Sequence, residues 1–200
     1  MEHQFEKKEE QQVGFRESFL EYLHDLIYIL TAVVLLCLIC FRVVVVSGSS
    51  MYNTLLDGDY LLLISNVLYH DPQPGDIVVA SKESFDNGAP IVKRVIATEG
   101  QIVDIDFEAG IVYVDGVALE EDYTYTKTTN EEGVSFPLRV EPGHVFLMGD
   151  NRERSKDSRS PEIGQVDRRE LLGKAVFLFM PGTNFGNDPF DISRIGVLGK

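Results

Sequence analysis

The feature that most constrains this chain is an apolar run over residues 26–46, which reads LIYILTAVVLLCLICFRVVVV and holds one charged residue, Arg42. About 20 apolar residues, rising 1.5 Å each, span the hydrocarbon core of a bilayer. The run therefore predicts a single transmembrane helix. A buried core helix and a cleaved signal peptide are the alternatives. The run is longer than a usual signal-peptide core, and no convincing small-residue cleavage site follows it.

Basic residues lie close to the run mainly on its N-terminal side. Lys7, Lys8 and Arg16 precede it, and after Arg42 the next basic residue is Lys82. The positive-inside rule counts basic residues in short flanking segments. It predicts a single-pass cell-membrane protein with a cytoplasmic N-terminus and an extracytoplasmic remainder.

The segment before the run, residues 1–25, has apolar positions near helical spacing, interleaved with acidic ones. We expect a cytoplasmic amphipathic segment that leads into the membrane helix.

The rest of the chain, residues 47–200, has the pattern of a β-rich domain. Short runs of β-branched and aliphatic residues alternate with Gly, Pro, Asp and Asn, which is typical of strands and turns. The predicted strands are residues 60–64, 76–81, 91–98, 101–106, 111–114, 145–148 and 174–180. The polar residues 126–135 are predicted to form a mobile loop. The predicted fold is mostly β: one transmembrane helix followed by an antiparallel, barrel-like β-domain.

Charge and histidine content exclude two classes of function. The net charge of −14 argues against binding nucleic acid, because a phosphate backbone requires a Lys/Arg surface. The four His are scattered and lack ligand spacing, so we expect neither a metal site nor a cofactor.

Two short segments suggest nucleophilic catalysis. The first, SGSSMYNTL at residues 47–55, contains Ser50 and follows the apolar run directly; alone, it fits a flexible loop equally well. In the second, strand alternation places Lys93 on one face with Ile91 and Val95. A desolvated Lys has a lowered pKa, and its neutral amine can take a proton from a serine hydroxyl. A Lys that snorkels from an edge strand is the alternative.

A third segment, MGDNRERSKDSR at residues 148–159, is dense in both charges and in turn-forming residues. Such runs are commonly solvated surface loops. The alternative is a hydrogen-bonded brace beside an active site, in which Asp150, Asp157 and Arg159 form ion pairs and Ser155 orients an amine.

Together the three segments resemble the type I (leader) signal peptidases, in their small Gram-positive form. The family's Ser-Met-x-x-Thr-Leu matches at Ser50, its Lys-Arg strand matches at Lys93, and its Gly-Asp-Asn-Arg-x-x-Ser-x-Asp-Ser-Arg signature is complete at residues 149–159. The resemblance covers essentially all of residues 26–181. One departure is Asn53, which stands where the family usually has Pro.

The resemblance implies a membrane-anchored serine endopeptidase whose catalytic domain is residues 47–200. Ser50 would be the nucleophile and Lys93 the general base, with the Lys93 amine oriented by Ser155. The oxyanion would be bound by the Ser50 N–H and by a second donor at Gly48, which has only its backbone to offer. Met51 is a candidate for the substrate pocket.

The family pattern also implies supporting ion pairs, between Asp150 and Arg94 and between Asp157 and Arg159. The partners would be signal-peptide-bearing precursors and membrane lipid. If the helix ends at residue 46, the four residues to Ser50 reach at most about 14 Å from the bilayer.

Two other functions are alternatives for this chain. One is a catalytically inactive, membrane-anchored peptide-binding module. The other is a self-cleaving SOS repressor, a Ser-Lys protease of related fold, which carries a DNA-binding N-terminus where this chain has an apolar run.

Overall fold

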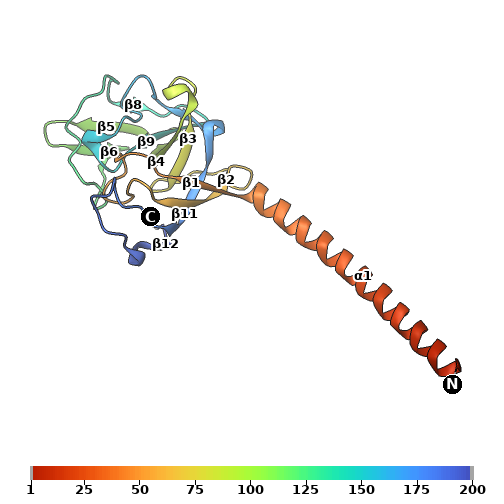
Figure 1. Cartoon of the computed structure of the whole chain (residues 1–200). Helices are drawn as coiled ribbons and strands as arrows, with labels where there is room; N and C mark the ends of the chain where they lie inside the picture. The colour runs from red at the N-terminus through yellow and green to blue at the C-terminus, as the bar shows by residue number, and fades with distance from the viewer. Residues whose placement is uncertain (1, 199–200) are drawn as a thin grey trace. The chain divides into compact units, whose positions relative to one another are not determined.

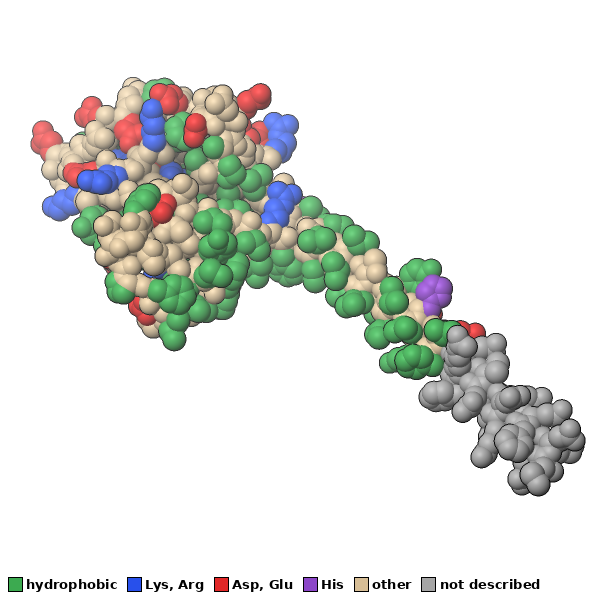
Figure 2. All heavy atoms as spheres, viewed as in Figure 1, with side chains coloured by type: hydrophobic (Ala, Val, Ile, Leu, Met, Phe, Trp, Pro, Cys, Tyr) green, Lys and Arg blue, Asp and Glu red, His purple; other side chains and the backbone are tan. Residues whose placement is uncertain are grey.

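The computed structural model describes the backbone of residues 2–198 and the side chains of residues 19–198. The chain divides into two units, Met1–Cys40 and Phe41–Lys200. In the first unit, helix α1 spans Glu2–Cys40, and its part Phe19–Cys40 has 22 residues with a mean hydropathy of 2.4. That length corresponds to about 33 Å, enough to cross a bilayer core. Hydrophobic side chains cover this part of the helix, and none of its residues is buried in the protein (Figure 2). This part of the helix is therefore apolar and uncovered, as a membrane anchor requires.

The helix ends at Cys40, six positions before the predicted end at residue 46. Strand β1, Phe41–Val45, follows it and pairs antiparallel with β2, Tyr60–Ser65. Consecutive valines favour this outcome, because β-branched side chains suit a strand and β2 supplies backbone hydrogen-bond partners. The distance predicted for Ser50 changes accordingly. Ten residues separate it from Cys40, so the chain permits up to about 36 Å instead of 14 Å.

The second unit consists of two antiparallel sheets (Figure 1). The larger has the order β1-β2-β11-β3-β4-β9-β10, with β12 paired to β11, and the smaller has the order β7-β6-β5-β8. The remaining strands of the larger sheet are β3 Ile77–Ser81, β4 Pro90–Thr98, β9 His144–Met148, β10 Val166–Asp167, β11 Leu171–Met180 and β12 Gly196–Val197. Those of the smaller sheet are β5 Ile102–Asp106, β6 Ile111–Val114, β7 Val117–Ala118 and β8 Leu138–Arg139. Short 3-10 helices are η1 Asp86–Gly88, η2 Arg152–Arg154, η3 Arg168–Glu170 and η4 Ile192–Arg194.

This architecture confirms the prediction of a mostly-β protein with one N-terminal apolar helix. All seven predicted strands are present, as β2, β3, β4, β5, β6, β9 and β11. The unpredicted strands are β1, hidden in the apolar run, and four two-residue strands that are too short to show a period of two.

Strand β4 is an interior strand of the larger sheet, and this position determines what its side chains contact. It pairs with β3 on one side and with β9 on the other. Its residues Val92, Val95 and Ile96 belong to three different hydrophobic clusters. Lys93 and Arg94 lie between them, so both charged side chains are carried into the interior by apolar neighbours that stabilise the strand.

Candidate active site

The loop that carries Ser50 is a tight turn closed over the core. The Tyr52 N–H donates to the Ser49 carbonyl at 3.1 Å, and the Leu55 N–H donates to the Met51 carbonyl at 2.8 Å. Met51 and Leu55 pack with Val46 in one hydrophobic cluster. Met51 is only 1% exposed, so its predicted contact with substrate stays a prediction. The buried apolar residues hold the turn, while its serines remain at the surface of the cluster.

Lys93 meets Ser50 across the fold, although 43 positions separate them in the chain. Lys93 Nζ lies 2.8 Å from Ser50 Oγ and donates to the Val92 carbonyl at 3.1 Å. Lys93 is 4% exposed. The distance lies within the range that a general base needs to take a proton from its nucleophile.

The surroundings of Lys93 favour the neutral amine. Burial lowers the pKa of Lys93 from 10.5 to about 8, against the opposing effect of nearby carboxylates, chiefly Asp157 and Asp150. At pH 7, a pKa of 8 leaves about one amine in ten neutral, whereas a pKa of 10.5 leaves about one in three thousand. Desolvation therefore supplies a usable population of base near neutral pH.

Asp150 joins the two segments that carry the Ser–Lys pair. Its carboxylate accepts two hydrogen bonds from Arg94, at 2.9 and 2.7 Å, and one from Thr54 Oγ1 at 2.5 Å. Arg94 and Asp150 are both buried. Arg94 is next to Lys93 on β4, and Thr54 lies four residues after Ser50. The Asp150 carboxylate therefore sets the distance between β4 and the loop that carries Ser50 (the nucleophile loop, residues 47–55).

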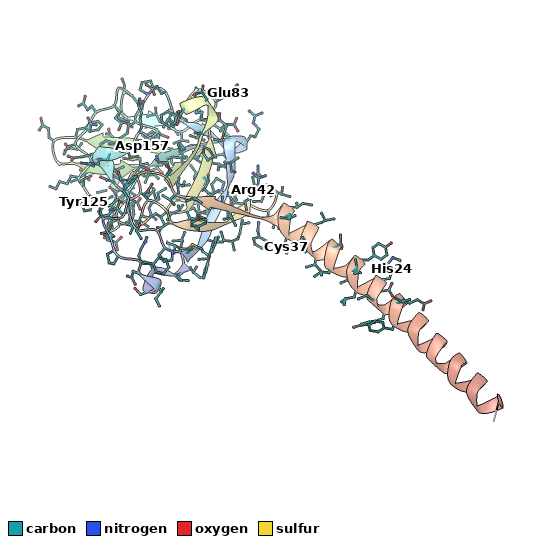
Figure 3. The ribbon with its side chains drawn as sticks, in the orientation of Figure 1. His24, Cys37, Arg42, Glu83, Tyr125 and Asp157 are labelled. Carbon is teal, nitrogen blue, oxygen red and sulfur yellow. The ribbon has the colours of Figure 1, made fainter. Side chains whose placement is uncertain are left out.

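Asp157 and Arg159 form a second buried pair, with contacts of 2.8 and 2.9 Å. Asp157 also accepts the Gly149 N–H at 3.0 Å, and Arg159 donates to the Arg152 carbonyl at 2.7 Å. Figure 3 shows Asp157 inside the β-domain. The segment over residues 148–159 is thus a folded brace and not a solvated loop.

Ser155 lies close to the Ser–Lys pair, separated from Ser50 by Gly149. A Cβ on Gly149 would come 2.2 Å from Ser155 Oγ and 2.5 Å from the Ser50 carbonyl, so only glycine fits there. Ser155 Oγ is buried and has no hydrogen-bond partner within the part of the chain that the structure describes. No hydrogen bond joins it to Lys93 among those residues, and its predicted orienting role stays a prediction.

Gly48 was predicted to supply an oxyanion donor, and this role stays a prediction. Its N–H donates to Asp57 Oδ1 at 2.8 Å, and its backbone has a φ of +90°. The Ser50 N–H, in contrast, has no acceptor among the backbone of residues 2–198 and the side chains of residues 19–198. An N–H without an acceptor at the nucleophile is a suitable donor for a developing oxyanion.

The polar segment that was predicted to be mobile, residues 126–135, is anchored to the brace. Arg152 is 1% exposed, donates to Thr128 Oγ1 at 2.6 Å and pairs with Glu121. Glu132 pairs with Arg159 at 3.4 Å. Buried ion pairs restrict a loop because opening it would leave charges unpaired in the interior. A cavity of about 500 Å³, lined by Ser155 and Glu132 among others, lies where this segment meets the brace.

The family follows from comparison with known proteins. Residues 19–180 match the family model described as signal peptidase, peptidase S26. The chain belongs to this peptidase S26 family.

Individual members of the S26 family are similar over most of the chain. The chain is 37% identical over 150 residues to a probable signal peptidase I-1 of Synechocystis, a match that covers 70% of this chain and 72% of that protein. It is 30% identical over 181 residues to a signal peptidase I of Bacillus licheniformis, covering 86% and 95%. The crystal structure of a signal peptidase I from Enterococcus faecalis matches with 31% identity and a TM-score of 0.43, covering 52% of this chain and 96% of that one.

The S26 match encloses the nucleophile loop, β4 and the brace. Three residues of the site had no role predicted from the sequence: Thr54, Asp57 and Gly149. Thr54 and Gly149 nevertheless belong to the family motifs at residues 50–55 and 149–159. Their roles are contacts between segments, which spacing along one segment does not reveal.

Proposed function

We propose that this chain is a signal peptidase I, which removes N-terminal signal peptides from secreted precursors with Ser50 as nucleophile and Lys93 as general base. The observation that carries the proposal is the 2.8 Å contact between Lys93 Nζ and Ser50 Oγ, made by a lysine that is buried. Membership of the S26 family supports the substrate class. The named relatives are themselves signal peptidases.

The chemistry proceeds in two halves. Ser50 Oγ attacks the scissile carbonyl carbon as its proton passes to Lys93 Nζ, and the Ser50 N–H stabilises the oxyanion. The C–N bond then breaks, and the Lys93 ammonium returns the proton to the leaving amine of the mature chain. The signal peptide remains as an ester on Ser50. Lys93 next takes a proton from water as the water oxygen attacks the ester carbonyl. The ester C–O bond then breaks, the Lys93 ammonium returns the proton to Ser50 Oγ, and the signal peptide leaves as its carboxylic acid.

The pairs Arg94–Asp150 and Asp157–Arg159 support this chemistry without contacting substrate. Both are buried and hydrogen-bonded on several sides. Arg94–Asp150 holds the loop that carries Ser50 and β4 at a fixed separation, and Asp157–Arg159 keeps the brace folded beside them. The Ser–Lys contact therefore requires no reorganisation when substrate arrives.

The membrane supplies the substrate, and we infer that the β-domain works at its outer face. Basic residues precede the apolar part of α1, Phe19–Cys40, which favours a cytoplasmic N-terminus. One face of β1 presents Phe41, Val43 and Val45, which are 42%, 59% and 47% exposed. Hydrophobic side chains gather at the end of the domain that carries β1, β2 and β11 (Figure 2). β1 follows the membrane helix directly, so an apolar face there suits contact with lipid.

Cleavage of a membrane-presented precursor tests the proposal. The full-length chain is placed in vesicles with a precursor whose apolar segment ends in small residues, and the products are identified by mass. We expect a single cut at the small residues. The inactive binding module predicts a stable complex with an intact precursor, and that result would contradict the proposal.

The rate of cleavage should depend on pH in a definite direction. Because Lys93 must be neutral to accept a proton, kcat/KM is expected to fall about tenfold per pH unit below a pKa near 8. The measurement is kcat/KM between pH 5 and 10, at constant ionic strength. An acid limb that titrates near 10.5 would show that Lys93 is solvated and is not the base.

A further inference from the structure

The turn before Ser50 is held by a carboxylate that the mechanism above does not use. The Gly48 N–H donates to Asp57 Oδ1 at 2.8 Å. Gly48 has a φ of +90°, and no atom of the described residues beyond its two chain neighbours lies within 4 Å of the place where its Cβ would be. Side-chain packing therefore does not hold this residue. The bond to Asp57 is a specific contact that maintains its left-handed conformation.

Asp57 is itself held in place by the backbone around it. The Gly58 N–H donates to the Val46 carbonyl at 2.9 Å, and the Val46 N–H donates to the Asp59 carbonyl at 2.8 Å. A Cβ on Gly182 would lie 2.2 Å from the Asp57 carbonyl, so two backbones touch there. Backbone contacts thus hold the turn over residues 57–59 on both sides, and they fix the position of the Asp57 carboxylate.

Further hydrogen bonds connect the turn over residues 57–59 to the C-terminal segment. Asp59 is fully buried and accepts bonds from Arg194, at 2.8 and 2.6 Å, and from the Gly182 N–H at 2.7 Å. Gly182 and Arg194 lie beyond residues 19–180, which match the family model. A chain of contacts therefore runs from the C-terminal segment through Asp57 to Gly48 and the nucleophile loop.

The contact with Asp57 decides which N–H groups can serve an oxyanion. The Gly48 N–H already donates to the Asp57 carboxylate, and an oxyanion placed beside it would be repelled by that negative charge. We propose that Asp57 is a positioning residue, whose bond to Gly48 orients the loop so that the Ser50 N–H, and not the Gly48 N–H, faces the scissile carbonyl. This inference rests on the proposed role of Ser50 as nucleophile.

Two substitutions at Asp57 test the inference in the full-length chain, with kcat and KM measured on the vesicle-presented precursor. Asp57→Ala removes the acceptor, and kcat is expected to fall about 10²-fold with little change in KM, since a small misplacement of a reacting group has that effect. Asp57→Asn keeps a carbonyl acceptor and should retain most of the wild-type kcat. The acid limb of the pH profile should stay in place, because Lys93 keeps its surroundings.

Asp115 provides a matched control. Its Oδ1 also accepts a backbone N–H at 2.8 Å, from Ile102, but it lies in the turn between β6 and β7 of the smaller sheet. Asp115→Ala should leave kcat unchanged. Melting curves are recorded for each variant. If Asp57→Ala does not fold, Asp57→Ser, whose hydroxyl is too short to reach Gly48, takes its place with the same expected loss.

The opposite outcome would overturn the inference. If the Gly48 N–H is an oxyanion donor, removing Asp57 frees it, and Asp57→Ala would cleave as fast as wild type or faster. An equal loss in Asp57→Asn and Asp57→Ala would also exclude the hydrogen bond as the cause. A wild-type chain that does not cleave at all contradicts the proposed function instead, so the two failures are distinguishable.

Discussion

Replacing Lys93 with methionine is expected to lower kcat for precursor cleavage by about 10³-fold or more. Methionine has a similar length and suits a buried position, so the variant should fold. It removes the only amine within hydrogen-bond distance of Ser50 Oγ among the described residues. The measurement is single-turnover cleavage of the membrane-presented precursor, which isolates the chemical step from product release.

Lys82 offers the matched control for this substitution. Its Nζ donates to the Gln165 carbonyl at 2.8 Å, away from the Ser–Lys pair, and Lys82→Met should cleave at nearly the wild-type rate. Ser50→Ala should lose as much activity as Lys93→Met, and combining the two should cost little more, because residues that act as one unit are not additive. Independent, multiplicative losses would contradict a shared proton-transfer step.

Replacing Asp150 with alanine is expected to lower the free energy of unfolding by about 3–5 kcal/mol, the usual cost of leaving one member of a buried ion pair unmatched. The Arg94 side chain would keep only its bond to the Gly75 carbonyl, and Thr54 Oγ1 would lose its acceptor. Cleavage should fall as well, because the loop that carries Ser50 would no longer be tied to β4. Denaturant unfolding in detergent and the cleavage assay measure the two effects.

An exposed pair on the same domain provides the comparison for Asp150→Ala. Lys156 and Glu162 are in contact at 2.7 Å, and their side chains are 49% and 57% exposed. Glu162→Ala should change neither stability nor cleavage measurably. The double variant Arg94→Met, Asp150→Leu should be more stable than Asp150→Ala, because it leaves no charge unpaired. A stability of Asp150→Ala equal to that of Glu162→Ala would show that Asp150 is not a structural support.

The membrane helix, most strands and the Ser50–Lys93 pair could be predicted from the sequence. The apolar run predicted a membrane helix, since hydropathy and length are local properties. Alternating apolar residues predicted seven strands, since a period of two is visible in four or more residues. The pairing of Ser50 with Lys93 came from family motifs, because nothing local connects residues 43 positions apart.

The tertiary structure decided what depends on contacts between distant segments. An apolar run of valines fits a membrane helix and a strand equally well, and only the presence of β2 as a partner ended the helix at Cys40. A run of charges fits a solvated loop until Arg152 and Arg159 are seen to be buried against carboxylates. The sequence made the Gly48 N–H a candidate oxyanion donor, and only the fold shows that this N–H also meets Asp57. Local sequence sets which conformations and charges are available, whereas burial and hydrogen-bond partners depend on chain segments that only folding brings together.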